Sequence, residues 1–311
     1  MTMLAFIFPG QGSQTVGMGK AFYDASPAAR KIFDEANAAL GLDLTRTMFE
    51  GPDTELALTT NTQPAVLTAS VAAAAACAEH GLRPALAAGH SLGEYSAFVI
   101  AGALRLADAV RIVRKRGEFM QQAVPVGTGA MAALMGLALD DVEALCRDAA
   151  RGEVVEVANV NSSAQIVIAG HKPAVERAVA LAGERGGKKS VLLPVSAPFH
   201  CALMKPAAER LAAELAQVSV ADPTIPVVRN VDAGVTRTAR DVVPFLLAQV
   251  ASPVRWTQCV QRLAAEGATT FVEVGPGRVL TALTRRIADG AKALSVEDPT
   301  SLEKALEAVK A

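Results

Sequence analysis

A serine between two glycines follows directly on an apolar run at residues 87–97, AAGHSLGEYSA. In the pattern Gly89-x-Ser91-x-Gly93, the small flanking residues let a strand turn sharply into a helix. Such a turn lifts the serine hydroxyl above the edge of the sheet and aims the N-terminus of the new helix at it. The pattern predicts a strand-turn-helix unit with an exposed nucleophile. In a chain with 24 glycines, an ordinary surface turn is the alternative that the motif alone leaves open.

Composition narrows the class of protein. The chain has 311 residues, enough for one large domain and a smaller one with a sizeable buried core. Hydrophobic residues make up 51% and charged residues 20%, with 30 basic against 31 acidic side chains, which disfavours both disorder and nucleic-acid binding. Aromatic residues are only 4%, which argues against a surface for stacking bases.

Cysteine usage and apolar segments favour a cytoplasmic location. The four cysteines lie far apart with no C-x-x-C pair, so the sequence indicates neither a zinc site nor a disulfide framework. The N-terminus, MTMLAFIFPGQG, lacks the basic region and long apolar core of a signal peptide. The uncharged stretch 56–78 is interrupted by Pro64 and several polar residues, and it is too weakly apolar to favour a membrane span.

A glycine-rich loop follows the first predicted strand, residues 3–8. Thr15 occupies the position of the third glycine in a dinucleotide fingerprint, and Met18 replaces the lysine of a Walker loop, so nucleotide binding is disfavoured. In an open α/β sheet, a loop at the carboxyl end of a strand still lies where ligands bind. Gln11 is therefore either an amide donor to a substrate or a solvated turn residue.

An amphipathic helix is predicted over residues 105–123 from apolar residues at spacings of three and four. At about 100° per residue, Arg116 falls within about 60° of Val113 and Met120 and leans toward the buried side. A charge directed at the core needs a partner. The sequence leaves two partners open, namely an acidic side chain of the protein and a carboxylate of the substrate.

The stretch 126–197 has the pattern of a separate unit. Its elements are predicted in the order βαββαβ, the ferredoxin-like arrangement, with strands over 129–137, 154–160, 165–169 and 189–195 and helices over 139–150 and 173–185. Further helices and strands follow it. We therefore predict an α/β fold: an α/β-hydrolase-like large domain with a parallel sheet, formed by 1–125 and 198–311, and an inserted ferredoxin-like small domain at 126–197.

A serine nucleophile needs a base within hydrogen-bond reach. Of the four histidines, His200 lies in a loop at the return from the predicted insertion, where a catalytic group held between two domains would sit. His90 adjoins Ser91 and should point away from it. His80 ends a predicted helix and His171 opens one. We therefore interpret His200 as the best candidate base.

Several short motifs occur in one order along nearly the whole chain. They are FPGQGSQ at 8–14, TQPA at 62–65, GHSLGEYSA at 89–97, RG at 116–117, PFH at 198–200, QVASPVRW from 249 and EVGPG at 273–277. In these motifs the chain resembles the malonyl-CoA:acyl carrier protein transacylases, the acyltransferase family of fatty acid and polyketide synthesis. The predicted insertion also matches the small domain of that family.

The resemblance implies a covalent mechanism. Ser91 would take the malonyl group from malonyl-CoA as an ester, with His200 as general base and then as acid toward the leaving CoA thiol. A carbonyl oxygen of Gln249 would hold the other histidine nitrogen, in the place that an aspartate takes in a triad. The backbone N–H of Leu92 and the side chain of Gln11 would stabilise the oxyanion.

The resemblance also implies how substrate is chosen. Arg116 would hold the malonyl carboxylate by a two-pronged contact. Phe199, a bulky aromatic directly before the histidine, favours unbranched malonyl over methylmalonyl. Gln63 and Asn161 lie in segments that line the site of the family. The implied partners are malonyl-CoA and acyl carrier protein, without nucleic acid, membrane, metal or another cofactor.

Other functions use part of the same pattern. A serine esterase or thioesterase of α/β-hydrolase type would use water to resolve the acyl-enzyme, but its histidine usually lies near the C-terminus and it has no role for an inward arginine. A docking scaffold with a decayed site is disfavoured because all the site residues are present. The acyl carrier protein could serve fatty acid synthesis, a polyketide pathway or a malonate decarboxylase system.

Overall fold

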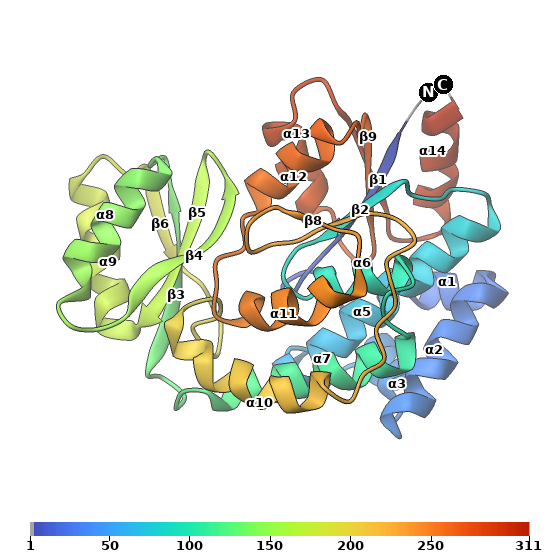
Figure 1. Cartoon of the computed structure of the whole chain (residues 1–311), viewed down its shortest axis with the longest axis horizontal. Helices are drawn as coiled ribbons and strands as arrows, with labels where there is room; N and C mark the ends of the chain where they lie inside the picture. The colour runs from blue at the N-terminus through green and yellow to red at the C-terminus, as the bar shows by residue number, and fades with distance from the viewer. Residues whose placement is uncertain (1–2, 311) are drawn as a thin grey trace.

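A six-stranded sheet forms the centre of the larger part of the protein. The computed structural model describes residues 3–310. The strand order is β10-β9-β1-β2-β7-β8, and neighbours are parallel except for the antiparallel pair β7 and β8. The strands are β1 (Leu4–Phe8), β2 (Leu86–Gly89), β7 (Val227–Val228), β8 (Val235–Thr236), β9 (Thr270–Val274) and β10 (Lys292–Val296). Figure 1 shows this sheet within the larger part of the molecule. The predicted α/β class with a parallel sheet is confirmed.

Alternate side chains of the central strands enter two different cores. Phe6 and Phe8 of β1 pack on one face of the sheet, and Ala5 and Ile7 pack on the other, as the two-residue period of a strand requires. The second face is covered by α12 (Trp256–Ala265) and α13 (Val279–Ile287). The first face is covered by helices from most of the chain: α1 (Lys20–Ala25), α2 (Pro27–Leu40), α3 (Leu44–Glu50), α4 (Asp53–Leu56), α5 (Thr59–Glu79), α6 (Gly93–Ile100), α7 (Leu106–Gln122), α10 (Lys205–Leu215), α11 (Ala239–Val250) and α14 (Pro299–Lys310).

The long helix α5 differs from its prediction at one end. The sequence predicts a helix start at Pro64, but α5 begins at Thr59 and Pro64 lies inside it. Proline removes one N–H from the helical ladder, while the N–H groups of Asn61 and Thr62 bond to the carbonyl of Leu58 and complete the turn before it. Within residues 3–310, no helix combines the length and apolar character that crossing a membrane requires.

A four-stranded antiparallel sheet with its own core lies beside the large sheet (Figure 1). Its order is β4-β5-β3-β6, which is the ferredoxin-like order for a βαββαβ chain. The elements are β3 (Gly129–Met135), α8 (Leu139–Ala150), β4 (Val155–Ser162), β5 (Gln165–His171), α9 (Lys172–Glu184) and β6 (Lys189–Leu192). The predicted ferredoxin-like arrangement is confirmed, and its final strand is shorter than expected.

Strand β4 joins the small sheet to the large part of the protein. Asn159 forms an isolated parallel bridge with Val254. Around it, the Val160 N–H donates to the Val254 carbonyl at 2.9 Å, and the Val254 N–H donates to the Ala158 carbonyl at 2.9 Å. The Thr257 hydroxyl adds a bond to the Val160 carbonyl at 3.1 Å. Main-chain hydrogen bonds therefore connect the edge strand of the small sheet to the segment that leads into α12.

Candidate active site

Ser91 lies in a tight turn between β2 and α6, at the carboxyl end of a central strand. Its backbone has a φ of 51°, in the left-handed region. The flanking glycines leave room for this turn, because a Cβ at Gly89 would come within 1.9 Å of the backbone of Gly93. A Cβ at Gly93 would come within 2.1 Å of the carbonyl oxygen of Phe8. The glycines are therefore required by the close approach of backbones on both sides of the serine.

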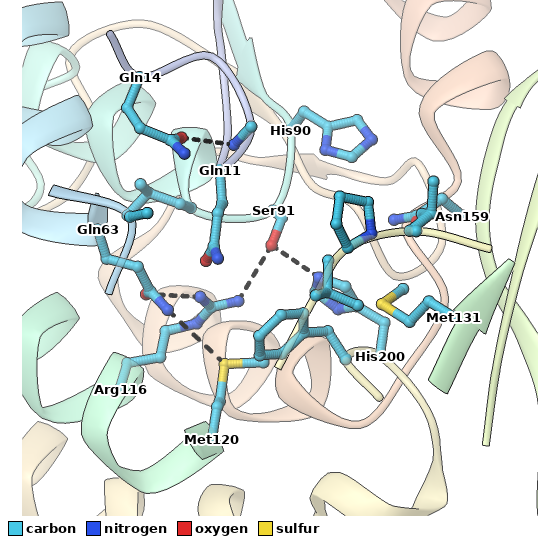
Figure 2. A pocket seen from close by; sticks show the side chains of 17 residues that line it. Gln11, Gln14, Gln63, His90, Ser91, Arg116, Met120, Met131, Asn159 and His200 are labelled. Carbon is cyan, nitrogen blue, oxygen red and sulfur yellow. Dashed lines mark hydrogen bonds between the residues drawn. The ribbon is translucent and has the colours of Figure 1, made fainter. Parts of the chain in front are cut away.

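His200 meets this serine from the loop that returns from the small sheet. Its Nε2 lies 2.7 Å from Ser91 Oγ (Figure 2). Its Nδ1 lies 3.0 Å from the backbone carbonyl oxygen of Gln249. Because that carbonyl can only accept, Nδ1 carries the proton and Nε2 is free to accept one from the serine. Burial, followed by the positive charge of Arg116, lowers the pKa of His200 to about 3. The imidazole is therefore neutral and oriented as a base.

Arg116 brings a buried positive charge to the same serine. One guanidinium nitrogen, Nη2, lies 3.2 Å from Ser91 Oγ, and Nη1 lies 2.7 Å from Gln63 Oε1 (Figure 2). Nη2 also lies 3.0 Å from Gln249 Oε1. The side chain is 2% exposed, and burial lowers its pKa. All of these hydrogen bonds go to uncharged groups. Among residues 3–310, Nε of this arginine has no hydrogen-bond partner. The helix α7 thus directs a cation inward, as its periodicity predicts, with no carboxylate bonded to it.

The two predicted oxyanion donors line the same cleft as the serine. Leu92 is the N-terminal flanking residue of α6 and is buried. Backbone N–H groups at a helix start have no partner within the helix and are available to an anion. Gln11 lies in the loop after β1, and its Nε2 donates to Thr59 Oγ1 at 3.1 Å. An amide nitrogen has two hydrogens, so this bond leaves Gln11 a second one to donate.

Ser91, His200 and Arg116 line one cleft of about 480 Å³, together with Gln11 and Leu92. Phe199 is 8% exposed and faces this cleft directly before the histidine. Gln63 also lines the cleft. Of the two asparagines in β4, Asn159 lines the cleft and Asn161 does not. Other lining residues that the sequence did not single out for the site come from several segments: Gly12, Gln14, Ala57, Met120, Met131, Leu193, Pro194 and Val195.

The remaining histidines take other positions. His90 Nε2 lies 3.0 Å from Asn161 Oδ1, and its ring turns away from Ser91 as predicted (Figure 2). His171 accepts a hydrogen bond from the Val154 N–H through Nδ1 and precedes α9. Within residues 3–310, no group of three histidine, cysteine or acidic side chains could hold a metal ion.

Two buried polar residues beneath the serine carry no signal in the sequence. Asn230 follows β7, and its Oδ1 accepts a hydrogen bond from the Ser91 N–H at 2.7 Å, while its Nδ2 donates to the Gly89 carbonyl at 2.7 Å. Glu94 lies in the first turn of α6 and is fully buried. The sequence carries no signal for Asn230, because the strand β7 that precedes it has only two residues and shows no period.

Comparison with known proteins places this geometry in a family. Residues 5–302 match the acyl transferase domain family. The chain belongs to that family. This acyl transferase domain is 52% identical over 308 residues to the malonyl CoA-acyl carrier protein transacylase of Escherichia coli O157:H7, with 99% of this chain and 100% of the relative covered. The family resemblance predicted from the motifs is therefore confirmed.

Solved acyltransferases have the same fold. The acyl-carrier-protein S-malonyltransferase of Burkholderia pseudomallei 1710b matches with a TM-score of 0.96 at 49% identity, covering 98% of this chain and 100% of that one. A malonyl-transacylase in complex with its type II PKS acyl carrier protein also matches with a TM-score of 0.96, at 45% identity and with 99% and 100% covered. The predicted pair of large and small units is the arrangement of these enzymes.

Proposed function

We propose that this acyltransferase moves the malonyl group from malonyl-CoA to the phosphopantetheine thiol of acyl carrier protein and so supplies fatty acid synthesis. The proposal includes a malonyl ester on Ser91 as the intermediate. It is supported by the names of the relatives and by the neighbour that is complexed with an acyl carrier protein. No metal or other cofactor takes part in the proposed steps.

The first half-reaction loads the enzyme. Ser91 Oγ attacks the thioester carbonyl carbon while His200 Nε2 takes the hydroxyl proton, and the negative charge moves to the thioester oxygen. The Leu92 N–H and the Gln11 amide stabilise that oxyanion. When the oxyanion collapses, the C–S bond breaks and the CoA sulfur leaves with the proton from His200. Gln249 holds the imidazole through its backbone carbonyl throughout.

The second half-reaction reverses these roles. The thiol of the carrier gives its proton to His200, and its sulfur attacks the carbonyl carbon of the malonyl ester. The C–O bond to Ser91 breaks, and Oγ recovers the proton from the imidazolium. A neutral carbonyl partner on Nδ1 stabilises the imidazolium less than a carboxylate would. Thioesters tolerate this because a thiolate is already a good leaving group.

The observation that carries the choice of malonyl is the buried guanidinium of Arg116. It lies 3.2 Å from Ser91 Oγ, and its hydrogen bonds go to neutral groups alone. A buried cation with no carboxylate hydrogen-bonded to it is costly, so the cleft favours an acyl group that carries its own carboxylate. The bulk of Phe199 leaves less room for a branch at the carbon next to the thioester, which favours malonyl over methylmalonyl.

We also propose the organisation that the sequence predicts. Residues 1–125 and 198–311 form the catalytic domain, and residues 126–197 form the small domain. The separate core of the small sheet supports this division. A cytoplasmic location is supported by four cysteines that are all free and buried. In this assignment the enzyme binds neither nucleic acid nor membrane.

The proposed function is tested by following the acyl group. The enzyme is incubated with malonyl-CoA, digested and examined by mass spectrometry. A malonyl mass on the peptide that contains Ser91 is expected. The ester should persist in water and discharge when phosphopantetheinylated acyl carrier protein is added. Discharge in water alone would indicate a thioesterase, and a label on another residue would reject the mechanism.

A further inference from the structure

Glu94 places a carboxyl group under the serine turn, out of contact with solvent. It lies in the first turn of α6, three residues after Ser91, and is 0% exposed. Its Oε2 accepts hydrogen bonds from the Gln249 side-chain Nε2 at 2.6 Å and from the Asn230 backbone N–H at 3.1 Å. Within residues 3–310, Oε1 has no hydrogen-bond partner. A buried carboxyl group that holds two donors from distant segments needs an explanation.

The first of these donors leads to the histidine and the arginine. The Gln249 amide also donates from Nε2 to the Ser91 carbonyl at 2.9 Å and accepts at Oε1 from Arg116 Nη2 at 3.0 Å. The backbone carbonyl of the same residue holds His200 Nδ1. If the amide were flipped, its oxygen would face both Glu94 Oε2 and the Ser91 carbonyl. Glu94 therefore sets the orientation of a residue that hydrogen-bonds to the serine, the histidine and the arginine.

The second donor leads to the serine turn itself. Asn230 brackets the turn from below, since its side chain bonds both the Ser91 N–H and the Gly89 carbonyl. Its own backbone N–H is held by Glu94. The left-handed backbone of Ser91 is a conformation that persists only when its surroundings impose it. The Glu94 carboxyl is thus connected to both supports of the turn.

The hydrogen bonds of Glu94 do not depend on its charge. Burial raises its pKa to about 7, while the bonds from Gln249 and Asn230 oppose that rise. The charged or titratable groups around it are Arg116 of α7, Arg229 beside β7, Tyr95 of α6 and Cys259 of α12. Oε2 accepts in the ionised form, and it still accepts in the neutral form when the proton resides on the unpartnered Oε1. A neutral side chain with the same acceptor would therefore do the same work.

We propose that Glu94 is a positioning residue for acyl transfer, acting through Gln249 and Asn230 to hold His200 and the Ser91 turn in register. This inference rests on the proposed function for its kinetic test. The role is that of a hydrogen-bond acceptor, so Glu94→Gln retains it and Glu94→Leu loses it. The residue touches neither substrate nor a reacting atom.

The kinetic test compares these two variants in the full chain. Glu94→Leu is expected to lower kcat of malonyl transfer about 100-fold, because small misplacements of catalytic groups have effects of that order. The KM for malonyl-CoA should change less than about threefold, since Arg116 keeps its bond to Gln63. Glu94→Gln should retain kcat within about threefold. Equal loss in both variants would show that charge is what matters and would overturn the proposal.

A matched control separates positioning from stability. Glu273 is also a fully buried glutamate, and it accepts from the N–H groups of Leu280 and Thr281 at 3.1 and 2.6 Å, far from the cleft residues in sequence. Glu273→Leu should lower thermal stability while leaving kcat per folded molecule unchanged. An unchanged kcat in folded Glu94→Leu would overturn the proposal.

A spectroscopic signal tests the same inference without substrate. The Nδ1 proton of His200 is observed by NMR of the imidazole N–H in the free enzyme. Glu94→Leu should shift this resonance, and Glu273→Leu should leave it in place. An unmoved resonance contradicts the proposal, whereas a moved resonance in a protein that transfers no malonyl leaves the positioning intact and rejects only the proposed function. If Glu94→Leu does not fold, Gln249→Met removes the same link, and an unchanged kcat and resonance in that variant would overturn the proposal.

Discussion

Ser91 and His200 meet at 2.7 Å with both backbones in the left-handed region, at φ 51° and φ 62°. For residues other than glycine, such conformations cost about 1–3 kcal/mol each and persist when the surroundings impose them. Two glycines and Asn230 impose the turn at Ser91. The return from the small sheet and the Gln249 carbonyl hold His200. The reacting pair is therefore preorganised by contacts that lie outside it.

The glycines of the turn should be intolerant of any side chain. In Gly89→Ala the new methyl group would lie 1.9 Å from backbone atoms of Gly93, where no side chain can move aside. We expect a loss of more than about 3 kcal/mol in the free energy of unfolding, beyond ordinary overpacking. Urea unfolding measures the change. The control is Gly183→Ala in α9, where nothing lies within 4 Å and helix propensity predicts a small gain. A stable Gly89→Ala protein would refute the close approach.

Replacing Arg116 should change which acyl group is transferred. Arg116→Ala removes the charge-assisted contacts to a malonyl carboxylate, so kcat/KM for malonyl-CoA should fall about 10- to 100-fold. Transfer from acetyl-CoA should persist or increase, because an acetyl group has no carboxylate to bind. Arg111→Ala on the exposed face of the same helix is the control. Equal losses for the two substrates would assign Arg116 to structure.

The pH profile of kcat/KM should lack the fall in activity near pH 6.5 that an ordinary histidine base produces. His200 acts as a base in its neutral form, and burial lowers its pKa to about 3. Protonation, and with it the loss of activity, would begin only well below the ordinary value of 6.5. We expect kcat/KM for malonyl-CoA to stay flat between about pH 5 and 8. An inflection near the ordinary histidine value in a stopped-assay profile would contradict this environment for the ring.

Stability should depend on pH through Glu94. Its pKa rises from 4.5 to about 7 in the folded protein, so the folded state keeps a proton that the unfolded state releases in this range. The stabilising contribution is present below 4.5 and is lost as pH rises through 7. By linkage the native protein should lose roughly 3 kcal/mol relative to Glu94→Gln across this window. Urea unfolding of both proteins at the two ends of this pH window measures the difference. If the free energy of unfolding changes equally with pH in the two proteins, Glu94 does not titrate in this window.

Local patterns were enough to predict most of the fold. The helix over Leu139–Ala150 has the predicted bounds, because it is long enough to show its period. The two-residue strands β7 and β8 have no such period, and only their neighbours in the sheet define them. The predicted start of α5 at Pro64 was wrong. Proline usually lies in the first turn of a helix, but hydrogen bonds to the Leu58 carbonyl extend this helix toward the N-terminus, before Pro64.

The site was predictable where a residue carries its own signal. Ser91 has its glycines, and Arg116 has its place on the helix wheel. Glu94 carries no such signal, because acidic residues are common in the first turn of a helix, where they interact favourably with the helix dipole. Its carboxylate accepts a hydrogen bond from the backbone N–H of Asn230, which is 136 residues away in the sequence. Such a relationship exists only in three dimensions, and the sequence of either segment does not contain it.

Backbone hydrogen bonds between β4 and Val254 hold one wall of the cleft through which substrates enter. Asn159 belongs both to that main-chain bridge and to the lining of the cleft. Widening the cleft on this side would require breaking the paired backbone bonds around Val254, whose net value is about 1 kcal/mol each. Opening this wall would therefore cost about 2 kcal/mol in these two bonds alone. In the proposed transfer, the thiol arm of the carrier protein would therefore reach Ser91 past a wall that backbone hydrogen bonds hold in place.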